Sequence, residues 1–200
     1  MLEFPSMFLG GSPNNTPALY SLMNYGDIVG GTWYPKGGMY EITKGFYKLS
    51  KELGVDYIFN EEISGFDINN GKIISAQSKN DKSYFSDSFI CCAEYPFVQT
   101  QLINKKYRSY NSSYWSKKNV APSALIFYLG LSEKIENLEH HNLFFDENFD
   151  EHLNDIFEKK IWPKNPLFYV CSPSKTDPSV VPDKNKENLF ILVPIGAGSV

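Results

Sequence analysis

The stretch GTWYPKGGMYEITKGFYKLSKELGV spans Gly31–Val55. It passes from an aromatic, extended segment closed by Pro35, through the pair Gly37-Gly38, into a segment with helical periodicity. Apolar residues recur there at three- and four-residue steps and form one stripe, which is typical of an amphipathic helix. The stripe consists of Met39, Ile42, Phe46, Leu49 and Leu53. The stretch therefore predicts a helix from Met39 to Leu53, with Gly54 as the residue that ends it.

The glycine pair raises the question of a phosphate-binding loop. A dinucleotide fingerprint needs a strand, then G-x-G-x-x-G, then a helix, so that backbone N–H groups face the pyrophosphate. Gly37-Gly38 lacks the third glycine and the βαβ context, and the Gly196–Gly198 segment has no helical pattern after it. We interpret both as turns. Gly37-Gly38 is expected to let the chain approach another group closely, and the chain shows no phosphate cradle.

The flanking sequence predicts a mixed α/β (α+β) fold. A short helix is expected after Thr16 as N-cap and Pro17 as first helical residue, with its end at Gly26. After the central helix the chain turns to β structure. The pair Asn70-Gly71 suits a type I′ hairpin turn. The expected β segments are 56–59, 62–68, 72–77, 83–86 and 88–93, the last one mostly apolar and predicted to be buried.

The remaining third alternates helix and strand patterns. Residues 94–118 are expected to be helical in pieces, and residues 123–131 are predicted to be a buried strand. Residues 146–160 have the pattern of an amphipathic helix with acids in the first turns and Lys159-Lys160 at the end, in accord with the helix dipole. Further strands are predicted at 142–145, 166–173 and 188–195.

Composition excludes several classes of protein. The 200 residues are 42% hydrophobic and 21% charged, which suffices for one ordinary domain with a core. A net charge of −4 argues against a nucleic-acid partner. The sequence contains neither a long apolar run nor a signal peptide at its N-terminus. Three cysteines, two of them adjacent, favour a reduced, cytoplasmic chain. The aromatic content of 16% indicates a large core or, alternatively, a cavity for a bulky apolar ligand; core packing is the preferred interpretation.

Residue chemistry alone gives no catalytic constellation and no metal site. His140 and His141 are adjacent and are expected to point apart, so no metal is predicted. Cys91 and Cys92 are expected to be small hydrophobic residues on a buried strand. The carboxylates near residue 150 are expected on the solvated face of their helix.

Several stretches together resemble the phytoene desaturase family of carotenoid desaturases, a branch of the flavin-dependent amine-oxidase-like superfamily. They are FLGGSPNNTPALYSLMNYGDIVGGTWYPKGGM, IFNEEISGF, CCAEYPFVQTQLI, SYWSKKNVAPSALIFYLGL, LEHHNLFF and FYVCSPSKTDPSVVPDKNKENLFILVPI. They occur in the family's order and spacing over nearly the whole chain, and they look most like the bacterial type that carries phytoene toward lycopene.

The resemblance implies an internal fragment, because family members are longer, with G-x-G-x-x-G upstream and a second flavin-binding segment downstream. The irregular start and the strand pattern close to the end agree with this expectation. Residues 37–94 would be part of an FAD/NAD(P)-binding domain with a β-meander. Residues 1–36 and 95–200 would belong to a mixed α/β substrate-binding domain.

The implied cofactor is FAD. In the superfamily, a residue at the position of Ile63 binds the adenine edge through its backbone N–H and C=O; the alternative for Ile63 is an ordinary sheet residue. The segment Cys92-Ala93-Glu94 matches the family's Asn-Ala-Asp near the cofactor, although its first and third residues differ. Gly37-Gly38 would mark the point where the chain re-enters the flavin domain. With no phosphate cradle, the isolated chain is expected to be inactive and to bind FAD weakly.

The implied substrate is a long, hydrophobic carotenoid, so its channel should be apolar and aromatic. Its candidate lining residues, which core packing would explain equally well, are Phe8, Tyr20, Trp33, Tyr34, Phe127 and Tyr169. Members of the family also contact the bilayer. A peripheral contact at the inner membrane is expected through Phe144, Phe145 or Trp162, since the acidic helix matches anionic lipid poorly.

The resemblance implies an FAD-dependent oxidoreductase that desaturates phytoene-like carotenoids by hydride transfer from an allylic C–H to the flavin, with proton loss. Two alternatives stay open. One is a carotenoid isomerase or another amine-oxidase-like FAD oxidoreductase. The other is a non-catalytic polyene- or lipid-binding module, which the missing phosphate cradle favours and the unfinished ends oppose. The sequence assigns no acid, base or oligomeric state.

Overall fold

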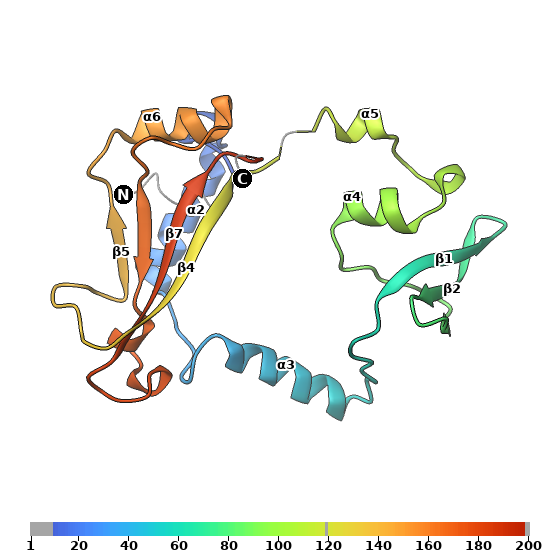
Figure 1. Ribbon diagram of the computed structural model, residues 1–200, viewed down its shortest axis with the longest axis horizontal. Coiled ribbons are helices and arrows are strands. Elements are labelled where there is room, and N and C mark those ends of the chain that lie inside the picture. Colours follow the sequence, from blue (N-terminus) through green and yellow to red (C-terminus); the bar gives the residue numbers. More distant parts are fainter. Residues whose placement is uncertain (1–9, 119, 199–200) are drawn as a thin grey trace. The chain divides into compact units, whose positions relative to one another are not determined.

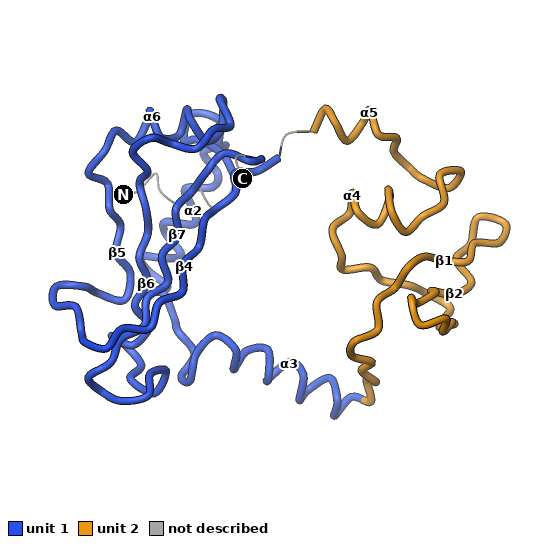
Figure 2. The backbone as a smooth tube through the Cα atoms, in the orientation of Figure 1, with its two compact units in different colours: residues 1–53, 120–200 blue, residues 54–119 orange. Residues whose placement is uncertain are grey.

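The computed structural model describes residues 10–118 and 120–198. The chain forms two compact units, one built from residues 1–53 and 120–200 and the other from residues 54–119 (Figure 2). These units follow contacts within the chain, and their limits differ from those of the three domain segments expected from the sequence.

The first unit is built on a four-stranded antiparallel sheet in the order β4-β7-β6-β5 (Figure 1). Its strands are β4 (Ser123–Leu131), β5 (His141–Phe144), β6 (Phe168–Cys171) and β7 (Glu187–Ile195). β4 and β7 pair along nine residues each, from Ser123 opposite Ile195 to Leu131 opposite Glu187. All four strands form where the apolar runs of the sequence predicted them.

One face of this sheet carries the core of the unit. Val170, Leu189 and Ile195 are buried on it. The core also includes Leu153 and Ile156, which lie in helix α6 (Phe149–Leu153) and its π-helical continuation η6 (Asn154–Lys159). This confirms the predicted amphipathic helix.

One carboxylate on that helix departs from the prediction that its acids are solvated. Asp155 is buried, and its Oδ1 accepts a hydrogen bond from Lys159 Nζ at 2.6 Å. The short i, i+4 ion pair offsets the cost of removing the carboxylate from water.

The predicted burial of residues 123–131 is wrong, although the strand itself forms. Ile126, Phe127, Tyr128 and Leu129 are all exposed, Tyr128 by 78%. The sheet order explains this exposure. β4 is an edge strand, and no described strand pairs with its outer edge. The apolar run therefore indicated a strand correctly but could not indicate what covers it.

The segment before the central helix is helical in short pieces. They are η1 (Pro13–Asn15), η2 (Ala18–Ser21), α2 (Leu22–Tyr25) and η3 (Gly26–Gly30). The helix thus runs past Gly26, its predicted end, because Gly26 keeps helical angles of φ −56° and ψ −47°. It ends at Gly31, whose φ of +76° leaves the helical region.

Helix α3 (Tyr40–Glu52) confirms the central prediction to within one residue at each end, and Gly54 follows it with a φ of +85°. Its apolar stripe is nevertheless exposed, from 44% at Ile42 to 76% at Leu53. The helix is therefore formed by its local sequence, and no described residue covers its apolar face.

The second unit contains the predicted hairpin and a three-stranded antiparallel sheet in the order β1-β2-β3. The strands are β1 (Ile63–Asn69), β2 (Lys72–Ser78) and β3 (Ser83–Phe85). Asn70 and Gly71 have φ angles of +49° and +77°, which confirms the type I′ turn.

Two of the expected strands of this unit do not form. Residues 56–59 and 88–93 have no strand partner among the described residues. Cys91 and Cys92 are exposed rather than buried, because a short apolar run becomes a strand only where a neighbouring strand pairs with it.

The rest of the second unit is helical in pieces, as predicted. The pieces are α4 (Tyr95–Phe97), η4 (Val98–Leu102), η5 (Lys105–Tyr107) and α5 (Ser112–Trp115). Within the described residues, no helix combines the length and the apolar character that crossing a bilayer requires.

Candidate functional site

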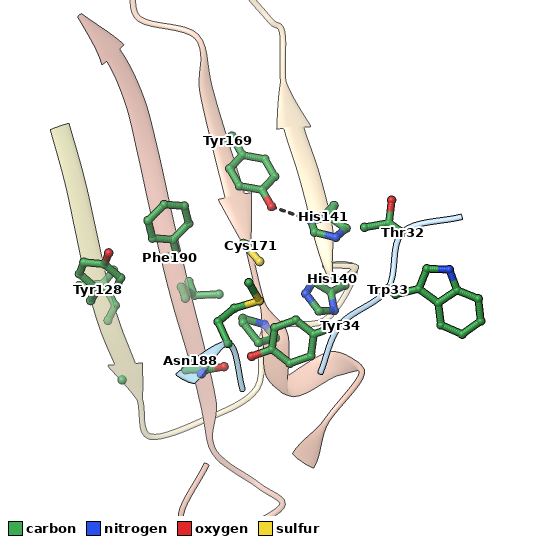
Figure 3. Close-up of a pocket in the computed structure, with 15 residues that line it drawn as sticks. Thr32, Trp33, Tyr34, Tyr128, His140, His141, Tyr169, Cys171, Asn188 and Phe190 are labelled. Atoms are coloured by element: carbon green, nitrogen blue, oxygen red, sulfur yellow. Dashed lines mark hydrogen bonds between the residues drawn. The ribbon is translucent and has the colours of Figure 1, made fainter. Parts of the chain in front are cut away.

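A pocket of about 830 Å³ lies on the open face of the four-stranded sheet (Figure 3). All of its residues belong to the first unit. The residues that line it are Thr32, Trp33, Tyr34, Met39, Tyr128, Leu129, Gly130, His140, His141, Tyr169, Cys171, Pro173, Asn188, Leu189 and Phe190. The set is rich in aromatic and aliphatic side chains and contains no carboxylate, lysine or arginine, so the pocket suits an uncharged, mainly apolar ligand.

The floor of the pocket is a row of side chains across all four strands. Tyr128 of β4 pairs with Phe190 of β7, Phe190 pairs with Cys171 of β6, and Cys171 pairs with His141 of β5. Residues directly opposite one another in a sheet point to the same face, so the four side chains form one line. This cross-strand row changes along its length from aromatic rings to a thiol and an imidazole (Figure 3).

The β5 and β6 end of the row is a polar cluster. His141 Nδ1 lies 2.6 Å from the hydroxyl of Tyr169, and His140 Nδ1 lies 2.7 Å from Thr176 Oγ1. The two imidazole rings are 4.4 Å apart between centroids. The prediction that these histidines point apart is therefore wrong. His140 lies in a bend before β5, where the alternation of a strand does not apply.

Burial favours the neutral forms of three members of this cluster. It raises the pKa of the Tyr169 phenol and of the Cys171 thiol, and it lowers the pKa of His140, an effect to which neighbouring His141 adds. Tyr169, Cys171 and His140 are thus uncharged near pH 7. Uncharged groups of this kind can exchange hydrogen bonds with a neutral ligand.

Three members of the cluster are also metal-ligand types. His140, His141 and Cys171 each offer one ligand atom, and these atoms lie within 4.8 Å of one another. Nitrogen and sulfur donors of this kind suit zinc or a similar ion. The sequence predicted no metal because the two adjacent histidines were expected to point apart. In the structure their rings lie next to each other, so this argument against a metal site no longer holds.

The segment before α3 forms a further side of the pocket. The ring of Tyr34 meets that of His140 edge to face, with centroids 4.9 Å apart. Trp33 lines the rim, but its indole points away from the cluster, is 89% exposed and donates from Nε1 to the carbonyl of Gly30 (Figure 3). Of the two aromatic residues, Tyr34 is the one in contact with the polar cluster.

The glycine pair explains how this segment is held. Gly37 and Gly38 have φ angles of +89° and +101°, and a Cβ on Gly38 would meet the Tyr34 hydroxyl and Val180 at 3.6 Å. The N–H of Gly37 donates to Asp177 Oδ2 at 2.6 Å. The pair therefore allows a close approach, as expected, and the group approached is the loop that contains η7 (Pro173–Lys175) and η8 (Pro178–Val180).

Replacing Asp177 by alanine should release this contact. Asp177 Oδ1 also accepts from the N–H and the hydroxyl of Ser179, at 2.9 and 2.6 Å. Hydrogen exchange at Gly37 should become about tenfold faster in the variant, since a charged acceptor is lost.

The hydrogen bonds of Ser179 and Gly37 hold the pKa of Asp177 below its usual range. In the wild type the protection should therefore persist at neutral pH and disappear only as the pH falls through that lowered pKa. Unchanged exchange at Gly37 in the variant would contradict this assignment.

The structure places the other residues expected at a site as follows. Tyr169 lines the pocket, whereas Tyr20, in η2, does not. Phe127 is on the opposite face of β4 from Tyr128, because it pairs with Ile191 rather than with Phe190. Ile63, Cys92 and Ala93 belong to the second unit, where Ile63 begins β1. Phe8 lies outside the described residues.

Sequence reasoning missed five residues of the row and cluster as ligand-binding candidates: Tyr128, His140, His141, Cys171 and Phe190. The sequence did contain information that could have identified some of them, because side chains alternate between the two faces of a strand. Tyr169 and Cys171 are two residues apart, so a strand there places both on one face. Pairing β6 with β5 would then have brought His141 opposite Cys171.

The model of the family "flavin containing amine oxidoreductase" matches residues 1–182 of the chain. The chain belongs to this family. Among similar proteins, a carotenoid 3,4-desaturase of Haloarcula japonica is 38% identical over 99% of the chain. A zeta-carotene-forming phytoene desaturase of Myxococcus xanthus is 30% identical over 97%, and a phytoene desaturase of Neurospora crassa is 31% identical over 98%. The chain spans 40%, 37% and 34% of the lengths of these three relatives, respectively.

Membership in the flavin amine oxidoreductase family implies FAD, and the described residues fit part of that cofactor. β1 is an edge strand of its sheet, so the backbone at Ile63 has a side that β2 does not occupy, as binding to an adenine edge requires. The pyrophosphate has no fitting cradle, because the 200 residues contain no G-x-G-x-x-G and the N–H of Gly37 is bound to Asp177. Among the described residues, the free edge of β1 is thus compatible with an adenine contact at Ile63, and no glycine-rich phosphate loop is present.

Proposed function

We propose that this chain is the central part of an FAD-dependent carotenoid desaturase, an oxidoreductase that removes hydrogen from a phytoene-like polyene. The relatives named above carry desaturase names, and nearly the whole of this chain aligns with a part of each of them. The single observation that carries the proposal is the 830 Å³ pocket, whose uncharged, aromatic lining suits a long hydrocarbon.

The residues of this chain would have two roles, which are contact with the polyene and enclosure of the pocket. Tyr128 and Phe190 offer ring faces against which a flat polyene can stack, and Tyr34 encloses the pocket from the side of the glycine pair. Bound flavin would supply the hydride acceptor. The protein would orient the chain of the substrate and exclude water from it.

We further propose the domain assignment given by the family resemblance. Residues 1–36 and 95–200 would contribute to the substrate domain, and residues 37–94 to the flavin domain, with Ile63, Cys92, Ala93 and the Gly37-Gly38 pair on the cofactor side. The exposed stripe of α3 supports this division, since it leaves an apolar face for the rest of the flavin domain to cover.

A peripheral position at the inner membrane is part of the proposal, because a carotenoid dissolves in the bilayer. Trp162 is 46% exposed and lies just beyond the acidic helix α6 and η6, where an aromatic residue can enter the lipid interface. Phe144 stacks on Phe168 and is only half-buried.

The complete open reading frame that contains this chain should be expressed in bacteria that accumulate phytoene. Desaturation should give products that lose two hydrogen atoms per new double bond and absorb at longer wavelength. Products of unchanged mass but altered geometry would identify an isomerase, and binding of phytoene without any product would identify a non-catalytic module.

The pocket itself can be tested with two neighbouring residues. Tyr128→Ala should lower kcat/KM by about tenfold through loss of a stacked ring, whereas Phe127→Ala, on the opposite face of β4, should leave it nearly unchanged. The reverse result would place the substrate on the other face of the sheet.

A further inference from the structure

Three metal-ligand side chains converge at the polar end of the pocket (Figure 3). His140, His141 and Cys171 each offer one donor atom, and these atoms lie within 4.8 Å of one another. In the part of the chain that the structure describes, this is the one such group of histidine, cysteine and acidic side chains. A zinc ion with bonds of about 2.0–2.3 Å would hold three donors about 3.5 Å apart, so small side-chain rotations would close the group around it.

The backbone already places the three donors together. His141 lies directly opposite Cys171 in the ladder between β5 and β6, so both side chains point to the same face of the sheet. His140 is held beside the same strand, because the N–H of Ser172 donates to its carbonyl at 2.8 Å. Two neighbouring residues of one segment and one residue of the facing strand thus meet on a rigid part of the fold, as a preformed metal site requires.

Hydroxyl groups orient both imidazole rings. Nδ1 of His140 lies 2.7 Å from the hydroxyl oxygen of Thr176. Nδ1 of His141 lies 2.6 Å from the hydroxyl oxygen of Tyr169, which also has a side-chain hydrogen bond with Cys171. Histidines that bind metal ions ordinarily have outer hydrogen bonds of this kind, which fix the orientation of the ring. Tyr169 is therefore a positioning residue for two of the three donors.

The surroundings select the kind of ion. The described residues that line the pocket include no carboxylate, so the hard, oxygen-preferring ions Mg²⁺ and Ca²⁺ find no suitable ligands. The lining also includes no lysine or arginine, so no fixed positive charge repels a cation. Imidazole nitrogen and thiolate sulfur suit Zn²⁺ and similar divalent transition-metal ions. Because His141 is exposed and Cys171 only half-buried, an ion can reach the donors from solvent.

We infer that His140, His141 and Cys171 form a binding site for one zinc-type divalent ion. Cysteine binds such an ion as the thiolate, so the thiol proton passes to solvent when the ion enters. Three protein ligands leave a fourth coordination position, which faces the pocket and takes a water molecule or another small donor. The inference concerns a different ligand from the polyene of the proposed function and does not rest on it.

The test measures zinc binding by the complete gene product with its flavin. The protein is freed of metal with EDTA, desalted and kept reduced with a phosphine, and Zn²⁺ is then titrated in competition with a chelating dye. The wild type should bind one ion per chain more than Cys171→Ser does. X-ray absorption of the protein loaded with one zinc ion should show one sulfur at about 2.3 Å and nitrogens at about 2.0–2.1 Å.

Four variants locate the site. Cys171→Ser and His141→Leu each remove a ligand and should weaken zinc binding by at least about 100-fold. Tyr169→Phe removes only an orienting hydroxyl, so it should cost about tenfold and keep the zinc–sulfur distance. Cys91→Ser is the matched control for the thiol, because Cys91 is an exposed cysteine of the second unit, and it should bind zinc as the wild type does. Thermal melting without zinc verifies that each variant is folded.

The possible results separate clearly. Equal zinc binding by the wild type and Cys171→Ser would overturn the inference, and so would a zinc–sulfur distance that is lost in Cys91→Ser rather than in Cys171→Ser. A zinc spectrum of the wild type without sulfur would overturn it without the need for any variant. Binding that both ligand variants lose and Cys91→Ser keeps would support it, even in a protein that desaturates no carotenoid and so refutes the proposed function.

Discussion

Replacing Glu187 by alanine is expected to lower the free energy of unfolding by about 3–5 kcal/mol, because it removes one partner of a buried ion pair. Glu187 is only 2% exposed. Its Oε2 accepts from the N–H of Ile135 at 2.7 Å, and its Oε1 accepts from Ser172 Oγ at 3.1 Å and faces Lys175 Nζ at 2.9 Å. Without the carboxylate, the Ile135 N–H and the Ser172 hydroxyl lose this acceptor, and Lys175 loses its counter-charge while it keeps the hydrogen bond to the carbonyl of Ile135 at 2.6 Å.

The same network predicts the direction of the pH dependence. Burial alone would raise the pKa of Glu187, but the hydrogen bonds from Ile135, Lys175 and Ser172 outweigh it and hold the pKa below its usual range. The contribution of Glu187 is therefore present above the pKa of an unfolded glutamate and is lost as the pH falls through the lowered, folded value. Wild type and variant should converge in stability in acid.

Chemical denaturation of both proteins at neutral and acidic pH measures these effects. Glu133→Ala is the matched control, since Glu133 is exposed and its loss should change stability by less than about 0.5 kcal/mol. A cost for Glu187→Ala as small as that of the control would mean that the network contributes no net stability. The position matters for the pocket as well, because Glu187 fixes the start of β7, just before Asn188 and Phe190.

Gly196→Ala is expected to cost about 3 kcal/mol, near the upper end for overpacking. A Cβ at this position would lie 2.5 Å from the backbone nitrogen of Ile161 and 2.7 Å from the Cα of Lys160. Backbone atoms cannot rotate away as the end of a long side chain can. The crowded segment is also held in place, because the N–H of Gly196 donates to the carbonyl of Ile161 at 3.1 Å.

Gly130→Ala provides the comparison, because a Cβ on this β4 glycine would meet nothing within 4 Å. It should be neutral or slightly stabilising, since alanine loses less backbone entropy than glycine in a strand. The difference between the two midpoints of thermal unfolding measures the cost of the steric clash at position 196. Equal midpoints would show that the Lys160-Ile161 segment yields at little cost.

The elements that local sequence determines were predictable from the sequence. Helix α3 follows from a single apolar stripe, and the first hairpin follows from Asn70-Gly71, whose left-handed angles few other pairs adopt. Elements that depend on partners were not. Residues 88–93 are as apolar as a buried strand, yet they have no strand to pair with, and β4 forms without the cover that its composition indicated.

The candidate site was predictable only in part, for the same reason. Tyr34 and Tyr169 were selected for their aromatic rings, and both line the pocket. Phe127 was selected over Tyr128 because nothing in a uniformly apolar run tells which residues face which side. The proximity of His141, Cys171 and Phe190 depends on the pairing of three strands, and their separation in sequence gives no hint of it.

The cross-strand row also determines where this protein can tolerate changes in chain length. Each strand contributes one side chain at the same level, so deleting or inserting a single residue within β5, β6 or β7 would shift that strand's alternation and turn its contribution to the opposite face. In the connection between β4 and β5, residues 132–140, Ile135 is held by Glu187 and Lys175 and His140 lines the pocket, whereas residues 136–139 have no strand alternation to keep. Evolutionary or engineered variation in length should therefore concentrate in connections of this kind, while the strands keep a fixed count of residues that protects the order of aromatic and polar groups.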